Sequence, residues 1–377
     1  MIRYRIYLWA APLLLVCVLL VAMTFVSRPI QAKSGGFYQQ TNLVSDISGL
    51  ASVTDPNLVN PWGLSHGPAT PWWVSDNGKG VATLYKGDGT PFPVGSPLVV
   101  TIPPPAGSPA GTTSAPTGNI FNGTSDFVVT ENGVSAPSLF IFATEDGTIS
   151  GWNRKVDVTN AILEVDNSAA GAVYKGLAMG SVGSSNFLYA TNFHAGVVER
   201  YDAHFHPAGS FTDSTLSTDC PITGQCFAPF GIRNINGNLY VTYALQKPGK
   251  HDDQAGPGNG FVDVFDTSGN LLQRLVSHGT LNSPWGLALA PNGFGRFGKD
   301  LLVGNFGDGH INAYKIDTGA FRGQLKDQKG NPITIDGLWA LDFGNGALAG
   351  PTDTLFFTAG INDEADGLFG SITKGNG

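Results

Sequence analysis

The segment Asn60-Pro-Trp-Gly-Leu64 recurs further along the chain as Ser283-Pro-Trp-Gly-Leu287. Weaker copies retain a small residue at the fourth position, which gives the series Gly63, Gly118, Gly176, Gly231, Gly286 and Ala340. Successive members lie 55, 58, 55, 55 and 54 residues apart. A period this even, continued over most of the chain, indicates six copies of one structural unit.

Each copy continues in the same way, with a turn, a short apolar run, an alternating strand, a hairpin signal and a closing strand. The apolar runs, which we interpret as second strands, are Trp72–Val74, Phe127–Val129, Phe187–Tyr189, Leu239–Val241, Leu301–Val303 and Leu355–Phe357. Six units of four antiparallel strands predict an all-β fold, a six-bladed β-propeller. A pair of β-sandwiches would not give this period, and a β-helix repeats over far fewer residues.

The two ends of the chain predict how the ring closes. The last unit stops after its third strand, near Ile372, whereas residues 37–44 precede the first glycine motif without a unit of their own. We therefore expect an N-terminal strand to complete the last blade. The predicted organisation is an N-terminal segment, residues 1–32, followed by a single propeller over residues 33–377.

The composition agrees with a propeller and excludes several alternatives. Charged residues make up 13% of the chain, against roughly 25% in ordinary domains, and Gly accounts for 51 of 377 residues. This argues against a coiled coil or a helical bundle and favours short strands joined by turns. The net charge of −8 argues against a nucleic-acid partner. The expected partner is a small molecule, a glycan or a protein.

The N-terminus has the pattern of an export signal. Arg3 and Arg5 precede an uncharged run from Tyr7 to Val26, and the small residue Ala32 follows. Cleavage after Ala32 is the preferred interpretation, and an uncleaved anchor, which would be the only membrane contact, is the alternative. Either way, we expect the bulk of the protein in the periplasm, outside the cell or on its surface.

Two cysteines follow the signal, Cys220 and Cys226, with Pro and Gly between them. An exported compartment permits disulfides, and this short turn-forming segment can bring the two Cα atoms within reach. We predict a disulfide rather than a metal site, because no Cys or His lies beside the pair at zinc spacing.

Polar residues follow the predicted second strands, and in a propeller these strand ends gather at one mouth of the central channel. The fourth unit has a longer insert there, Gln246 to Gly260. The candidate ligand residues are Asp76, Asn77, Glu131, Asn192, His194, His251, Asp252, Asp253, Asn305, Asp308, Asn362, Asp363 and Glu364.

Two interpretations of these residues remain open. Asp and Asn are the usual residues of tight turns, which would explain most of them. Alternatively, equivalent positions in successive blades could supply oxygen ligands to Ca²⁺, and the candidates are Glu131, Asn192, Asn305 and Asp363. The tryptophans of the glycine motifs are better explained by packing between blades than by ligand stacking. No nucleophile motif or phosphate loop occurs.

Several motifs together resemble a family of exported bacterial proteins of unknown function. They are Asn60–Leu64, Gly176-Leu177, Ala190–His194, Lys250–Asp253 with Gly256–Gly260, Gly304–Gly309, Asp336–Ala340 and Gly360–Glu364. The resemblance covers roughly residues 36–372. It implies a propeller related to the NHL and lactonase groups, and it carries no established catalytic residues.

Three functional hypotheses follow. The first is an exported binding or interaction propeller, and the second is a lactonase-like hydrolase in which a channel-mouth Ca²⁺ polarises a carbonyl group and activates water. The third is a structural matrix protein. The sequence leaves the ligand and any cofactor undetermined.

Overall fold

The computed structural model describes residues 1–2, 36–216 and 218–375. The predicted signal or anchor falls on residues 3–32, outside this described part. Contacts divide the chain into Met1–Gly35 and Gly36–Gly377, and the second unit contains every described strand.

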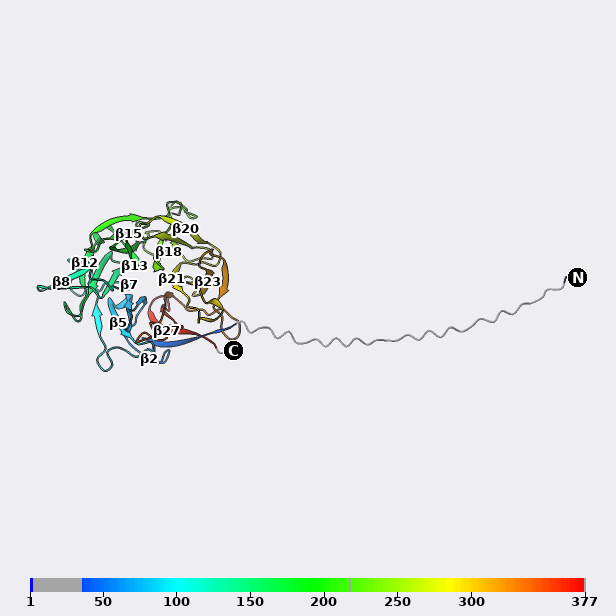
Figure 1. The fold of residues 1–377 in the computed structure, drawn as a ribbon, viewed down its shortest axis with the longest axis horizontal. Helices are drawn as coiled ribbons and strands as arrows, with labels where there is room; N and C mark the ends of the chain where they lie inside the picture. The colour runs from blue at the N-terminus through cyan, green and yellow to red at the C-terminus, as the bar shows by residue number, and fades with distance from the viewer. Residues whose placement is uncertain (3–35, 217, 376–377) are drawn as a thin grey trace. The chain divides into compact units, whose positions relative to one another are not determined.

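Residues 36–375 form a ring of six antiparallel sheets around a central axis (Figure 1), which confirms the predicted six-bladed propeller. The first blade consists of β3 (Pro61–Ser65), β4 (Trp72–Asp76), β5 (Val81–Tyr85) and β6 (Val99–Thr101). The second consists of β7 (Pro116–Phe121), β10 (Phe140–Thr144), β11 (Thr148–Trp152) and β12 (Ile162–Asp166). The third consists of β13 (Tyr174–Val182), β14 (Ser185–Asn192), β15 (Val197–Tyr201) and β16 (Pro207–Phe211).

The remaining blades repeat this order of strands. The fourth consists of β17 (Phe227–Ile235), β18 (Asn238–Leu245), β19 (Phe261–Asp266) and β20 (Leu271–Ser277). The fifth consists of β21 (Pro284–Leu289), β22 (Asp300–Asn305), β23 (Ile311–Lys315) and β24 (Phe321–Gln324). The sixth consists of β25 (Leu338–Phe343), β26 (Leu355–Ile361), β27 (Asp366–Lys374) and β1 (Tyr38–Ser45), with β2 (Val53–Thr54) parallel to β1.

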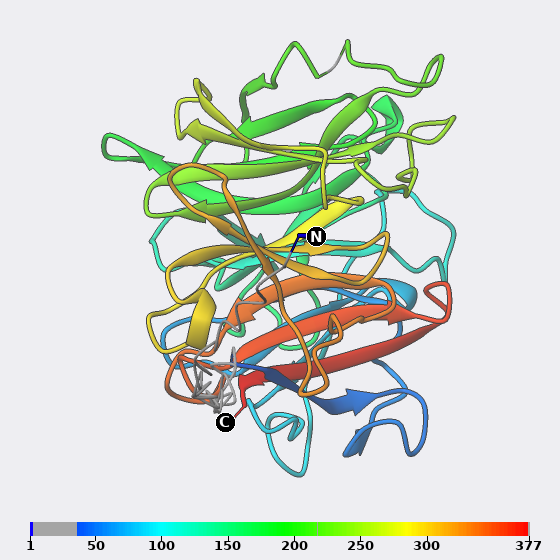
Figure 2. The same ribbon diagram turned by 90° about the vertical axis from the view of Figure 1, so that its right-hand side faces the viewer.

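The chain closes its ring through β1, as the sequence predicts. This strand pairs antiparallel with β27, from Tyr38 opposite Lys374 to Ser45 opposite Leu368. Figure 2 shows the two ends of the propeller lying side by side, with β1 in blue and β27 in red. Residues from both ends therefore share the sixth blade, which leaves no open seam in the ring.

The first strand of each blade contacts the first strand of the next, and β25 contacts β3, so these six strands line the channel. A Cβ added at Gly63 would overlap the backbone of Thr117, and one at Gly118 would overlap Leu177. A Cβ at Gly286 would likewise overlap Trp339. The repeated glycine is therefore explained by the close approach of neighbouring backbones.

The second blade departs from the predicted register. The run at Phe127–Val129 was expected to form its second strand, but the structure places Val128–Glu131 in β8, which pairs only with β9 (Val134–Pro137). The second strand is β10, which pairs with β7. The error arose because the β8–β9 hairpin is inserted between the first and second strands of this blade. Apolar and polar residues also alternate in the hairpin, so its sequence predicts a strand as well.

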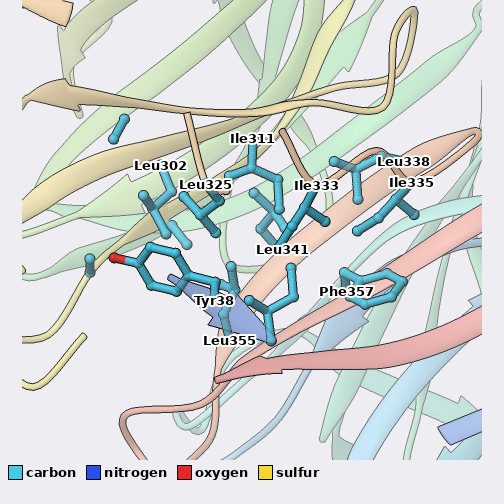
Figure 3. Packing of buried hydrophobic residues seen from close by; sticks show 14 of the residues in the cluster. Tyr38, Leu302, Ile311, Leu325, Ile333, Ile335, Leu338, Leu341, Leu355 and Phe357 are labelled. Atoms are coloured by element: carbon cyan, nitrogen blue, oxygen red, sulfur yellow. The ribbon is translucent and has the colours of Figure 1, made fainter. Parts of the chain in front are cut away.

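Apolar side chains fill the spaces between neighbouring blades. In one cluster, Leu302 and Ile311 from the fifth blade pack with Leu341 and Leu355 from the sixth (Figure 3). Tyr38 of β1 joins this cluster, so the closing strand also contributes to the core. Burial of these side chains supplies the main stabilising free energy of the ring.

Three short 3-10 helices complete the described elements: η1 (Asn77–Lys79), η2 (Ser168–Ala170) and η3 (Gly295–Phe297). The predicted Cys220–Cys226 disulfide is present, in the loop between β16 and β17. Among the described residues there is no helix with the length and apolar character needed to cross a membrane.

Candidate functional site

Four of the six residues that precede the small residue of a glycine motif are aromatic, and they belong to one buried cluster. They are Trp62, Phe230, Trp285 and Trp339, and all four are buried. The rings of Trp62 and Trp339 stack with centroids 3.4 Å apart, and Trp285 meets both edge-on. The tryptophans thus pack against each other across the channel, and they form a layer that divides it into two ends.

Lys175 takes the place of an aromatic residue in this layer. It is the residue before Gly176, and it is 2% exposed. Its ammonium lies 5.0 Å from the ring centre of Trp62 and 5.9 Å from that of Phe193. A buried charge needs a partner of opposite charge, and Lys175 Nζ donates to Glu145 Oε1.

Glu145 follows the last residue of β10, at the channel end where the first strands begin. The Glu145 backbone N–H donates to the Ala115 carbonyl. In the first blade, the Asn77 backbone N–H donates to the Asn60 carbonyl in the same way. The Asn77 carboxamide donates to Glu145 Oε2 over 3.0 Å. The two carboxylate oxygens are therefore held from two sides, by Asn77 and by Lys175.

The insert of the fourth blade brings three more titratable residues to Glu145. His251 Nδ1 lies 2.8 Å from Asp252 Oδ1 and 4.0 Å from Glu145 Oε1. The hydrogen bond to Asp252 and the charge of Glu145 raise the pKa of His251, and the same bond lowers the pKa of Asp252 to about 2. Asp253 is 7% exposed, and burial raises its pKa against the influence of Lys175.

Glu364 reaches the same place from the turn between β26 and β27. It is half-buried, and burial together with the charges of Glu145 and two neighbouring aspartates raises its pKa to about 7. Asn362, Asp363 and Glu364 have φ values of 56°, 53° and 66°. Three consecutive left-handed residues without glycine store strain, which is typical of functional sites.

We call this group the acidic mouth, defined as Glu145, Lys175, His251, Asp252, Asp253 and Glu364. It contains four carboxyl groups, one lysine and one histidine above the aromatic layer. Within this group the four carboxyl groups outnumber the lysine and the histidine, which favours a negative potential at this end of the channel.

Other predicted residues form structural contacts instead. Asp76 is fully buried at the end of β4, accepts from Thr83, and has a strongly raised pKa because of burial. The Asn192 carboxamide donates to Glu199 and accepts from Val173 and Ala195. Asn305 donates to Thr280 and Asp308.

The last predicted residues lie in turns or outside the blades. Asp308 caps a turn through the backbone of His310, and His194 follows the buried Phe193 with its imidazole near Gly171. Asn362 and Asp363 are exposed, and the Asn362 side chain donates to Asp366. Glu131 lies at the end of β8 in the separate hairpin. The four predicted calcium ligands thus engage separate surroundings.

The sequence prediction missed Glu145 and Lys175. Glu145 was overlooked because the second strand of its blade was assigned to the inserted hairpin. Lys175 had a visible signal, since Tyr174-Lys-Gly-Leu177 places a lysine where Asn60-Pro-Trp-Gly-Leu64 has tryptophan.

The other end of the channel is a cavity of about 280 Å³ below the aromatic layer, which we call the opposite chamber. Its lining includes His66, Phe121, Met179, Arg233 and Asp342. Arg233 and Asp342 pair across it over 2.6 Å, from the fourth blade to the sixth. The charges of this pair balance, in contrast to those of the acidic mouth.

Comparisons with known proteins place the chain in a family. No model of a known protein family matches it. Uncharacterized protein R648 of Acanthamoeba polyphaga mimivirus is 32% identical over 339 residues, covering 88% of this chain and 79% of that protein. Uncharacterized protein L690 of the same virus is 29% identical over 342 residues, covering 88% and 84%. The chain belongs to the family that includes R648.

Solved structures support the fold alone. A Bacteroides thetaiotaomicron protein of unknown function superposes with a TM-score of 0.51 at 10% identity, over 90% of this chain and 76% of that one. Streptogramin B lyase superposes with a TM-score of 0.49 at 13% identity, over 90% and 98%. The propeller class expected from the bacterial resemblance is confirmed, whereas membership of that bacterial family remains a prediction.

Proposed function

We propose that this protein is an exported propeller that binds a small cationic ligand at the acidic mouth. The observation that carries the proposal is the gathering of Glu145, Asp252, Asp253 and Glu364 at one channel mouth, where Lys175 is the buried cation and the charge of Lys247 also acts on the two aspartates. A cation entering this mouth would meet excess negative charge above a layer of aromatic rings, and both features attract cations.

The proposed location rests on the sequence and on the disulfide. The basic and apolar N-terminal pattern is that of an export signal. The Cys220–Cys226 bond would persist in an oxidising compartment outside the cytoplasm. The resemblance to exported bacterial proteins supports the same location.

Thermal melting of the full chain tests the binding proposal. The probes are spermidine, choline, arginine and divalent metal chlorides, with citrate and gluconate as anionic comparisons. A ligand present at 100 times its Kd stabilises the folded state by about 2.7 kcal/mol, so at least one cation should raise the Tm by several degrees.

Two variants show whether the acidic mouth is responsible. Glu145→Gln should abolish the shift, because it removes the carboxylate that pairs with Lys175 and lies 4.0 Å from His251. Asp202→Asn is the matched control, because Asp202 is an exposed turn carboxylate outside the mouth. Equal shifts in both variants, or equal stabilisation by the anions, would contradict the proposal.

A second candidate function is hydrolysis, favoured by the position of Glu364. The strained turn holds this carboxyl group half-buried in the mouth, and a pKa of about 7 suits a general base near neutral pH. In this function Glu364 would take a proton from water attacking a lactone or ester.

Proton release from a panel of lactones and esters tests this candidate. The rate should rise with pH through about 7, as Glu364 loses its proton. Glu364→Gln should lower the rate at least about 100-fold. Glu164→Gln alters another half-buried glutamate, on the outer strand β12, and this control variant should keep the native rate of proton release. Absence of turnover, or equal loss in both variants, argues against hydrolysis.

A further inference from the structure

We propose that the acidic mouth binds a divalent transition-metal ion through Glu145, His251 and Asp252. This inference rests on the proposed cationic-ligand function and specifies the ligand. One donor atom from each of these residues lies within 4.8 Å of the other two, and no other such trio occurs in the part of the chain that the structure describes.

The spacing of the donor atoms suits one shared ion. His251 Nδ1 lies 2.8 Å from Asp252 Oδ1 and 4.0 Å from Glu145 Oε1. Neighbouring ligands at about 2.1 Å from a metal stand roughly 3–3.5 Å apart, so small side-chain rotations would bring all three into coordination. The ion would replace the proton that His251 and Asp252 share.

Supporting contacts hold the three residues in place. Asn77 donates to Glu145 Oε2 and fixes the plane of that carboxylate. The Lys247 N–H donates to the Asp252 carbonyl over 2.8 Å, and Gln246 bridges to Asp253. Partners that orient ligands in this way are a regular feature of metal sites.

A separate observation concerns the neighbouring carboxyl group of Asp253. Asp253 is 7% exposed, and its Oδ2 atom has no hydrogen-bond partner among the described residues. The Ser283 hydroxyl and the charges of Lys175 and Lys247 lower its pKa, which burial raises, and its charge in turn acts on Glu364. A buried carboxylate oxygen without a hydrogen-bond partner is costly, and a nearby divalent ion would stabilise it.

The donor set selects the kind of metal. Ca²⁺ prefers six to eight oxygen ligands, whereas an imidazole with two carboxylates suits Zn²⁺ or Mn²⁺. Lys175 balances the charge of one of the four carboxylates of the mouth, so a divalent ion would offset most of the charge of the remaining three. We therefore expect Zn²⁺ or Mn²⁺ to bind more tightly than Ca²⁺, unlike the Ca²⁺ site predicted from the sequence.

Isothermal titration of the EDTA-treated full chain with ZnCl₂, MnCl₂ and CaCl₂ tests the proposal. We expect one ion per chain and at least tenfold tighter binding of Zn²⁺ or Mn²⁺ than of Ca²⁺. His251→Gln should weaken binding at least tenfold. His206→Gln is the matched control, because His206 also stands beside an aspartate, Asp202 at 3.5 Å, but on an exposed turn.

Three results would overturn the metal site: no saturable binding, equal loss of affinity in both variants, or tighter binding of Ca²⁺. The binding function can be judged separately. If metals fail but an organic cation still stabilises the native chain and not Glu145→Gln, the cationic-ligand function stands without the metal. If no cation binds, both proposals fail.

Discussion

The two ends of the channel are separated by one layer of aromatic rings, yet their charged groups differ. One end has a balanced ion pair, and the other has more carboxyl groups than cations. In the opposite chamber, Arg233 and Asp342 form one pair whose arginine is 34% exposed. In the acidic mouth, Lys175 is 2% exposed and stands among four carboxyl groups. The same six first strands line both ends, so the difference arises from single substitutions in the repeat and from the loops that follow the second strands.

This contrast shows where the structure maintains unfavourable interactions. A balanced pair whose arginine is partly exposed to solvent costs little and contributes little to stability. Several carboxyl groups crowded beside a buried lysine oppose one another, and they persist only because the surrounding blades fix their positions. Such an arrangement is typical of a binding or reaction site rather than of a structural contact.

The largest expected effect comes from Lys175→Met, which fills the aromatic layer but leaves Glu145 without its cation. Breaking a buried pair from one side typically costs about 3–5 kcal/mol of unfolding free energy. Urea unfolding at pH 7 measures this change in the free energy of unfolding. The double variant Lys175→Met with Glu145→Gln should recover much of the loss, and a single variant as stable as the native chain would show that the pair contributes nothing.

A smaller effect, opposite in sign, is expected from Glu364→Gln. The folded-state pKa of about 7 lies above the ordinary glutamate pKa of 4.5, so the folded chain holds this proton more tightly than the unfolded chain. The Glu364 contribution to stability therefore falls as pH rises from about 4.5 to 7. Glutamine resembles the protonated form and should stabilise the chain at pH 8, by about 2 kcal/mol.

At pH 4 the same substitution should be nearly neutral, because Glu364 is then protonated in both states. Paired melting curves at pH 4 and pH 8 provide the measurement. A stabilisation that does not change with pH would mean that the acidic mouth does not perturb Glu364.

The smallest effect is expected in the opposite chamber. Arg233→Met should lower the free energy of unfolding by no more than about 1 kcal/mol, because the arginine is partly exposed and its pair is screened by solvent. A double-mutant cycle with Asp342→Asn measures the coupling. A loss as large as that of Lys175→Met would remove the distinction between the two ends.

Most of the fold could be predicted from the sequence. The glycine period gave six blades because each first strand must approach its neighbour closely, as Gly63 and Gly118 show. The unpaired segment before Asn60 predicted the closing strand β1. The one misplaced strand, Phe127–Val129, reflects a local pattern that cannot tell which sheet a strand joins.

The candidate site could be predicted only in part. The sequence prediction named His251, Asp252, Asp253 and Glu364, and the structure brings these residues together in the acidic mouth. Glu131, Asn192, Asn305 and Asp363 were predicted to occupy equivalent positions in successive blades, and in the structure they have different surroundings. One of these residues belongs to an inserted hairpin, Asn192 and Asn305 satisfy neighbouring polar groups, and Asp363 lies in an exposed turn.

The sequence by itself determined the architecture, because a repeated steric requirement at Gly63 and its five counterparts leaves a regular trace along the chain. The tertiary structure alone decided which charges meet. The acidic mouth draws on four different blades, which supply Glu145, Lys175, Asp252 and Glu364. Their approach depends on turn conformations and loop lengths that the repeat of the glycine motif does not specify. Close packing of backbones repeats from blade to blade, whereas the meeting of side chains at the acidic mouth occurs once.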